Sequence, residues 1–145
     1  MHDLPRKLTV DELAVLFEGR TRFVQRLAAC ENPLGEASQL LRTVPEEERV
    51  EALNAHPRIG ERRLSATSAR EQGTDEDPRV MGELERLNQA YENRFGFRFM
   101  VFVNRRSRAE ILEVLRQRLT RSREQEMDTA IDELVAVARD RWRRR

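Results

Sequence analysis

Residues 77–96 have the sequence DPRVMGELERLNQAYENRFG, which gives the clearest secondary-structure signal in the chain. Its apolar side chains recur at alternating spacings of four and three, so they would share one face of a helix. They are Val80, Leu84, Leu87 and Tyr91. Asp77 and Pro78 are a typical helix start. We therefore predict a long amphipathic helix that begins at Pro78 and ends near Phe95 and Gly96.

Further helices are predicted on both sides of this segment. Thr9 with Glu12, and Ser107 with Glu110, have the spacing of a capping box, in which side chains satisfy backbone N–H groups at a helix start. Pro45 is expected to open another helix, since its missing N–H costs nothing at that position. Helical spacing is found in Val10, Leu13, Leu16 and Phe17, in Phe23, Val24, Leu27 and Ala28, in Ile111, Leu112, Leu115 and Leu119, and in Met127, Ala130, Ile131, Leu134, Val135 and Ala138.

Other segments interrupt the helical pattern. Asn32-Pro33 and Gly35 are expected to end the second helix, which leaves a short third helix around Leu40 and Leu41. Residues 97–103 are apolar and β-branched, but no partner strand is evident, so a buried extended linker is expected there. The fold predicted is all-α: one compact domain over residues 1–145, a bundle of about seven or eight helices with one buried extended segment.

Composition narrows the class of protein. The chain has 145 residues, of which 39% are hydrophobic and 37% charged, a balance that suits a folded single domain with highly charged surfaces. The formal net charge is only +1, which argues against a nucleic-acid-binding surface over the whole protein. Arginines gather at the C-terminal end, where a solvated helix end is the more common explanation. They are Arg139, Arg141, Arg143, Arg144 and Arg145.

The sequence also favours a cytoplasmic location. Cys30 is the only cysteine, so no internal disulfide can form, which fits a reducing compartment. Residues 1–10 lack the apolar run of a signal peptide. No stretch approaches the roughly 18 apolar residues that a membrane-spanning helix needs.

His56 is the first candidate for chemistry. It stands between Ala55 and Pro57, and proline disfavours the helical region for the residue before it, so His56 should lie at a helix exit. Imidazole titrates near neutrality and can transfer protons there. A lone histidine, taken by itself, is nevertheless structural more often than catalytic. His2 is near the terminus and is given no role.

No metal or nucleotide cofactor is expected. A zinc site needs three or four Cys, His or carboxylate ligands, and this chain offers one cysteine and one well-placed histidine. Cys30 lies on an apolar helix face, which favours a buried thiol over a nucleophile. The sequence has no glycine-rich phosphate loop and no G-x-S-x-G motif.

A second polar cluster lies in residues 65–72, which could form a brief helix. Ser68, Glu71 and Gln72 would then share one face, at spacings of three and four. A hydroxyl, a carboxylate and an amide can surround a small molecule rich in hydrogen-bonding groups. A solvated surface turn is the simpler explanation of the same residues.

Three motifs together resemble the OHCU decarboxylase family, whose substrate is 2-oxo-4-hydroxy-4-carboxy-5-ureidoimidazoline. They are HPRIGE at residues 56–61, SxxEQ at residues 68–72 and LNxxYxxxFGFxF at residues 87–99. Each motif alone is weak, but their order is specific and the likeness covers nearly the whole chain. The resemblance implies a cofactor-independent carboxy-lyase that forms (S)-allantoin from a small-molecule substrate. It also implies a homodimer, and a pathway shared with urate oxidase and hydroxyisourate hydrolase.

The resemblance assigns roles to individual residues. His56 and Glu71 match the catalytic histidine and glutamate of the family. The positions that match its substrate-binding residues are Pro57, Ser68, Gln72, Phe99, Met100, Val101, Phe102, Val103 and Arg141.

Two departures from the family pattern stand out. Arg98 replaces a usual proline, and Trp142 replaces the leucine that often follows the family's final arginine, which leaves Arg139 as an alternative to Arg141. Two other functions stay open on the sequence alone. One is a non-enzymatic helical module whose basic C-terminal end contacts an acidic partner or nucleic acid. The other is a related lyase that acts on another ureido or imidazole compound.

Overall fold

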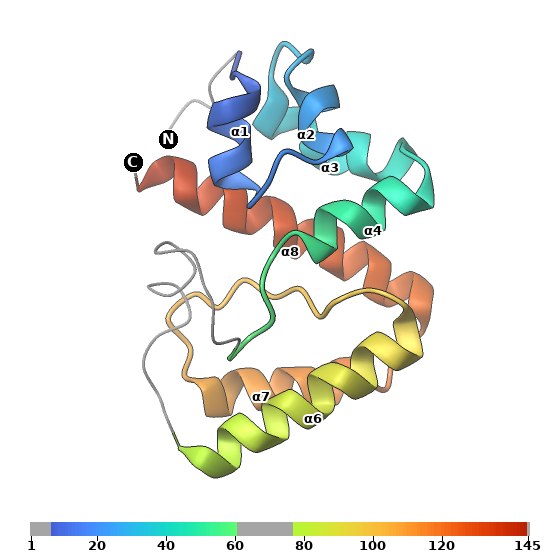
Figure 1. Cartoon of the computed structure of the whole chain (residues 1–145), viewed down its shortest axis with the longest axis vertical. Coiled ribbons are helices and arrows are strands. Elements are labelled where there is room, and N and C mark those ends of the chain that lie inside the picture. Colours follow the sequence, from blue (N-terminus) through green and yellow to red (C-terminus); the bar gives the residue numbers. More distant parts are fainter. Residues whose placement is uncertain (1–6, 61–76, 145) are drawn as a thin grey trace. The chain divides into compact units, whose positions relative to one another are not determined.

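The computed structural model describes residues 7–60 and 77–144, and this part of the chain contains seven helices and no strand (Figure 1). The all-α prediction is therefore confirmed. The helices are α1 (Val10–Leu16), α2 (Arg22–Leu27), α3 (Pro33–Thr43), α4 (Glu46–Asn54), α6 (Pro78–Phe95), α7 (Arg108–Arg118) and α8 (Arg123–Arg143). None of these helices combines the length and apolar character needed to cross a bilayer.

The chain divides into two compact units. Unit 1 consists of Met1–His56 with Asp128–Arg145, and unit 2 consists of Pro57–Met127. Helix α8 therefore begins in unit 2 and continues into unit 1, and the boundary between His56 and Pro57 falls inside one of the motifs. The sequence-based expectation of a single domain over residues 1–145 stays a prediction.

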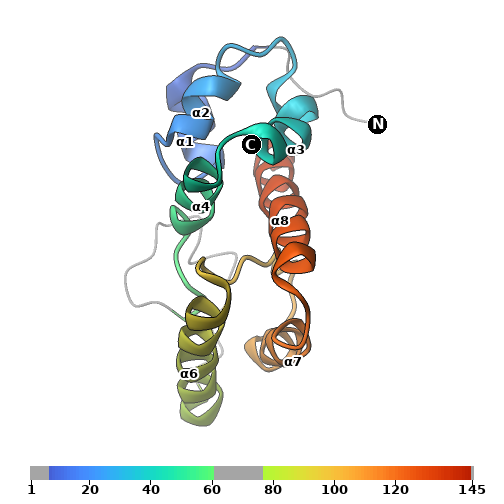
Figure 2. The ribbon, with the colours of Figure 1, turned by 90° about the vertical axis from the view of Figure 1, so that its right-hand side faces the viewer.

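Unit 1 is organised around α2, which packs against α1, α3 and α4. Phe17 and Phe23 meet edge to face in its core, with ring centroids 5.4 Å apart. Helix α8 supplies further fully buried side chains, among them Ile131 and Leu134. The ribbons of α3 and α8 lie close together (Figure 2). Arg42 ties the two helices, because its Nη2 lies 3.0 Å from Asp132 Oδ1. Most of the predicted apolar positions of α1, α2 and α8 are therefore buried in this unit.

Local capping explains where several helices begin. Both capping boxes form as predicted: Thr9 and Ser107 accept hydrogen bonds from the backbone N–H groups of Glu12 and Glu110, respectively, and both glutamates accept in return. Pro45 is the N-cap residue of α4. These interactions lie within four residues of the helix start, which is why the sequence pattern identifies them.

The interpretation of Asn32-Pro33 and Gly35 as the end of the second helix is wrong. Helix α2 ends earlier, at Leu27, and Asn32 is instead the N-cap of α3, where its Oδ1 accepts a hydrogen bond from the Gly35 N–H. Pro33 occupies the first turn of α3, where its missing N–H is no loss. Helix α3 is consequently longer than expected, because Asn32 and Pro33 start this helix and do not end the one before it.

Unit 2 combines the helix pair α6 and α7 with the segment that joins them. Residues 98–103 form neither helix nor strand and run as an elongated segment (Figure 1). Tyr91 of α6 packs its ring against those of Phe95, Phe97 and Phe99, at centroid distances of 4.6, 5.9 and 5.4 Å. The predicted long helix and the predicted buried extended segment are both confirmed, and aromatic packing joins them.

A group of polar side chains, here called the Glu126 cluster, consists of the buried Tyr91, Arg118 and Glu126 and the partly exposed Arg121. Glu126 is fully buried and accepts hydrogen bonds from Tyr91 Oη at 2.5 Å, Arg118 Nε at 2.7 Å and Arg121 Nη1 at 3.0 Å. Arg118 Nη1 also donates to the Met100 carbonyl at 2.6 Å. The cluster therefore attaches the main chain of the extended segment to α7 and α8.

Residues just after His56 are also attached to α6. Arg58 forms a two-pronged ion pair with Glu92, at 2.6 and 2.8 Å, and Asn88 Nδ2 donates to the Ile59 carbonyl at 3.2 Å. Asn88 belongs to the LNxxYxxxFGFxF motif, so this motif helps to fix the residues that directly follow His56 and Pro57.

Candidate active site

His56 lies where the sequence predicts it, just beyond the end of α4. The helix ends at Asn54 with Ala55 as C-cap, and the His56 N–H still donates to the Leu53 carbonyl at 3.3 Å. The side chain is 6% exposed. Pro57 cannot continue the helical hydrogen bonding, so the chain leaves the helix at this point.

Arg141 lies in the last turn of α8 and is held by the end of α1. Its Nη1 donates to the carbonyls of Val15 and Leu16, at 3.1 and 3.4 Å, and its Nη2 lies 3.1 Å from Glu18 Oε1. The Arg141 side chain is 4% exposed and that of Glu18 15%. A buried guanidinium is thus fixed by two carbonyls at a helix C-terminus and by one carboxylate.

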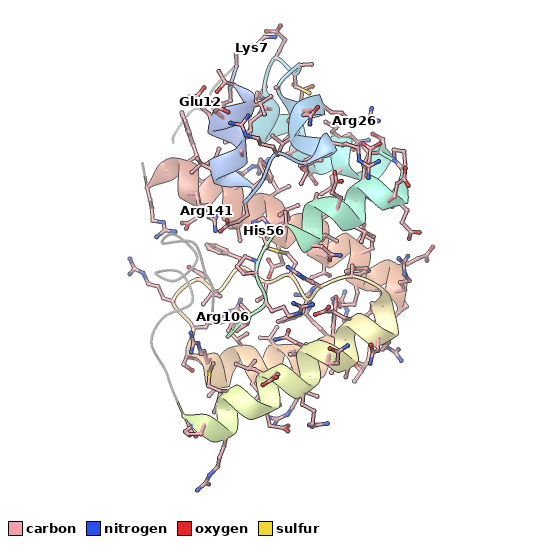
Figure 3. The ribbon with its side chains drawn as sticks, in the orientation of Figure 1. Lys7, Glu12, Arg26, His56, Arg106 and Arg141 are labelled. Carbon is pink, nitrogen blue, oxygen red and sulfur yellow. The ribbon has the colours of Figure 1, made fainter. Side chains whose placement is uncertain are left out.

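His56 and Arg141 influence each other within unit 1, and Figure 3 labels both. The pKa of His56 is lowered from 6.5 to about 4, first by burial and second by the positive charge of Arg141. Glu18 and the main chain of Ala52 act in the opposite direction. The imidazole is therefore neutral at pH 7 and can accept a proton from a bound molecule.

Glu18 was missed by the sequence analysis. It follows the C-cap residue Phe17 and has φ of 63°, in the left-handed region that glycine usually occupies at a helix end. The neighbouring Gly19 marks a turn in the sequence, but no local rule connects Glu18 with an arginine 123 positions later. Only the folded structure brings the two together.

The other predicted site residues are distributed as follows. Pro57 and the extended segment belong to unit 2, where Phe99, Met100, Val101 and Val103 are buried and Phe102 is partly exposed. Ser68, Glu71 and Gln72 lie outside the described residues. Their assignments, and that of the brief helix over residues 65–72, stay predictions.

The main chain of the extended segment is held by two arginines. In addition to the Arg118 contact with Met100, Arg106 Nη2 donates to the Phe102 carbonyl at 2.7 Å and its Nε to the Val103 carbonyl at 3.1 Å. A segment held in this way presents its remaining main-chain groups in a fixed arrangement.

The sequence left two candidates, Arg139 and Arg141, for the arginine of the site, and the structure gives them different contacts. Arg139 donates from Nε and Nη2 to the Leu34 carbonyl, at 3.1 and 2.9 Å, and so ties α8 to α3, whereas Arg141 is the arginine that acts on His56. Cys30 lies beyond the end of α2 and is only partly buried, so the expectation of a buried thiol on a helix face is wrong. This partial burial still raises the pKa of the Cys30 thiol, which favours the protonated, unreactive form. Within residues 7–60 and 77–144, no three His, Cys, Asp or Glu side chains are grouped as metal ligands would be.

The buried, neutral state of His56 predicts a pH-dependent stability. An unfolded chain binds a proton at His56 below about pH 6.5, whereas the folded chain resists protonation until about pH 4. The free energy of unfolding should therefore fall by about 2 kcal/mol between about pH 7 and about pH 5 because of this residue. Urea titrations at several pH values would measure the decrease, and His56→Asn is the control that should lack it. An equal decrease in both proteins would contradict a buried neutral imidazole.

Comparisons with known proteins agree on one family. A family model described as OHCU decarboxylase matches residues 2–143. A 2-oxo-4-hydroxy-4-carboxy-5-ureidoimidazoline decarboxylase of Halalkalicoccus jeotgali is 31% identical over 115 residues, which are 76% of this chain and 61% of that protein. The uric acid degradation bifunctional protein PucL of Bacillus subtilis is 28% identical over 157 residues, covering 97% of this chain and 31% of PucL. The chain thus spans less than two thirds of the length of these relatives.

The fold has a close match among solved structures. A crystal structure of an OHCU decarboxylase in the presence of (S)-allantoin superimposes with a TM-score of 0.74 at 23% identity, covering 90% of this chain and 94% of that one. The likeness to this structure supports the all-α fold.

Proposed function

Since the chain belongs to the OHCU decarboxylase family, we propose that it decarboxylates 2-oxo-4-hydroxy-4-carboxy-5-ureidoimidazoline to (S)-allantoin in urate degradation. The observation that carries this proposal is the buried, neutral imidazole of His56 beside the guanidinium of Arg141. The imidazole can accept a proton and the guanidinium can stabilise negative charge, and this reaction requires both.

The substrate supplies its own electron sink. Its carboxylate and hydroxyl share one ring carbon, which adjoins a C=N bond. When the bond to the carboxylate breaks, carbon dioxide leaves and the electron pair moves toward the C=N nitrogen. The hydroxyl then loses its proton to become a carbonyl, while the neighbouring ring carbon and the former C=N nitrogen each gain one, so that overall one proton replaces carbon dioxide. A decarboxylation of this kind does not need the electron sink that cofactors provide elsewhere.

The protein contributes position, charge and proton transfer. Neutral His56 would accept the hydroxyl proton, and Arg141 would offset the negative charge of the reacting carboxylate and of the ring as it develops. Burial strengthens both effects, because charges interact more strongly away from water. Delivery of a proton to one face of the ring would give (S)-allantoin rather than a racemate.

The remaining assignments rest on the resemblance. Glu71 would act with His56, either by holding the substrate hydroxyl or by tuning the imidazole. Ser68, Gln72 and Pro57 would bind the substrate, together with the main chain of residues 99–103. The hydrogen bonds from Arg106 and Arg118 to that main chain support a segment held ready for a ligand.

We further propose that residues 1–145 act as a single functional domain, in a homodimer, in the cytoplasm. The even balance of charge and the single cysteine fit this location. Light scattering of the purified chain would test the dimer, for which a mass twice the 17.1 kDa of the monomer is expected.

The decisive experiment generates the substrate in place from urate, with urate oxidase and hydroxyisourate hydrolase. Addition of this protein should accelerate the ultraviolet decay of the intermediate, and the allantoin formed should be optically active. Decay at the spontaneous rate with racemic allantoin would refute the proposal. In that case other ureido and imidazole acids should be tested, and salt-dependent binding to acidic partners would indicate the non-enzymatic alternative.

Cofactor independence gives a separate prediction. Because the substrate provides the electron sink, prolonged treatment with EDTA should leave the turnover rate unchanged. Metal analysis before and after the treatment is the control. Loss of turnover that a divalent metal restores would show that the reaction proceeds by another mechanism.

A further inference from the structure

Glu18 combines an unfavourable backbone conformation with a buried ionic contact. Its φ of 63° lies in the left-handed region, which costs a residue other than glycine about 1 kcal/mol or more. Asn104 and Arg105 also have positive φ, but both are exposed residues of a turn. Glu18 is different because its carboxylate is largely buried and meets a buried arginine.

The contact fixes one particular guanidinium. The carbonyls of Val15 and Leu16 hold Nη1 of Arg141, while Glu18 holds Nη2, so the end of α1 and the residues after it constrain the orientation of the planar group. Without the carboxylate, this buried charge would lose a counter-ion and could turn toward other acceptors.

Glu18 also acts on His56 directly. Arg141 disfavours the protonated imidazole and Glu18 favours it, so the two charges oppose each other at the same group. A positive charge that was not offset would weaken His56 as a proton acceptor, whereas the Glu18–Arg141 pair keeps a guanidinium near it at a smaller electrostatic cost.

We propose that Glu18 is a positioning residue for the reaction: it orients Arg141 beside His56 and offsets part of its charge there. The inference rests on the proposed function, and it adds a residue that lies outside the three motifs of the family resemblance. Glu18 need not touch the substrate, because it acts through Arg141 and His56.

A double-mutant cycle on activity tests the first half of this role. Glu18→Gln keeps the size and one acceptor oxygen but removes the charge, and it should lower kcat/KM by about tenfold or more. In an Arg141→Met background the same change should cost no more than about twofold, because the group to be positioned is gone. Glu47→Gln is the matched control. Glu47 lies on α4, the helix before His56, and its exposed carboxylate pairs with Arg22 of α2. Removal of this charge should leave kcat/KM unchanged.

Nuclear magnetic resonance tests the second half without substrate. The chain has only two histidines, so the imidazole signal of His56 can be assigned by its loss in His56→Asn. The pKa of His56 should rise above about 4 in Arg141→Met and fall again in Glu18→Gln/Arg141→Met. This comparison holds even where the single variant Glu18→Gln fails to fold, since the double variant removes the buried guanidinium together with the carboxylate.

Two results would overturn the inference. One is an equal loss of kcat/KM from Glu18→Gln in the parent and in Arg141→Met, which would show that Glu18 acts independently of Arg141. The other is an unchanged pKa of His56 between Arg141→Met and the double variant. If the parent protein fails to decarboxylate the substrate, the proposed function is wrong, yet the resonance measurement still decides whether Glu18 acts on His56.

Discussion

His56→Asn is expected to keep the fold and to lose at least about a hundredfold in turnover, the low end for a group that transfers protons. Asparagine has a similar polar reach but does not titrate near neutrality. His56 lies beyond the C-cap of α4, outside the helix itself. Steady-state kinetics on the substrate made in place would measure the loss, and circular dichroism would check the fold.

The same variant can contradict the catalytic assignment. A His56→Asn protein that unfolds easily yet keeps full activity per folded molecule would show that His56 is a packing residue. Its burial makes this a real alternative, since a 6% exposed side chain contributes to the core in any case. Activity has to be normalised to the folded fraction for the two outcomes to be separated.

Glu126→Ala is expected to produce the largest loss of stability, about 3–5 kcal/mol of unfolding free energy. It removes the acceptor of Tyr91, Arg118 and Arg121 at once, and it leaves Arg118 as a buried charge without its carboxylate. Urea denaturation of both proteins would measure the difference.

Glu124→Ala is the matched control, because Glu124 lies in the same first turn of α8 but is exposed. Its unfolding free energy should change by no more than about 0.5 kcal/mol. Replacement of both partners, as Arg118→Met with Glu126→Leu, should recover much of the lost stability, since no charge is then left buried. Equal effects of Glu124→Ala and Glu126→Ala would mean that the Glu126 cluster contributes little.

The features that sequence predicted well are local ones. Both capping boxes, the long helix α6 and the exit of the chain at His56-Pro57 depend on residues within a few positions of one another. Asn32-Pro33 shows the limit of such rules, because the same dipeptide suits a loop or a helix start. Only the side-chain hydrogen bond to Gly35 distinguishes the two.

The features that sequence could not predict are contacts across the chain. Glu18 meets Arg141 across 123 positions, and Tyr91 meets Glu126 across 35. Helical periodicity says which face of a helix is buried, but it does not say which buried polar group will find which partner. Arg141 was identified through the family resemblance, whereas no comparable signal pointed to Glu18.

The way unit 1 is assembled has a consequence for the order of events during synthesis. Unit 2 is one continuous stretch, Pro57–Met127, so it can fold as soon as it has left the ribosome. Unit 1 joins Met1–His56 to Asp128–Arg145, and its closing contacts span more than a hundred positions. Helices α1–α4 can pack on one another first, but the contacts of α1 and α3 with α8 must wait until α8 has been made. The contacts of Arg141 with Val15, Leu16 and Glu18 are therefore among the last to form, so the guanidinium that acts on His56 is fixed only once α8 is in place.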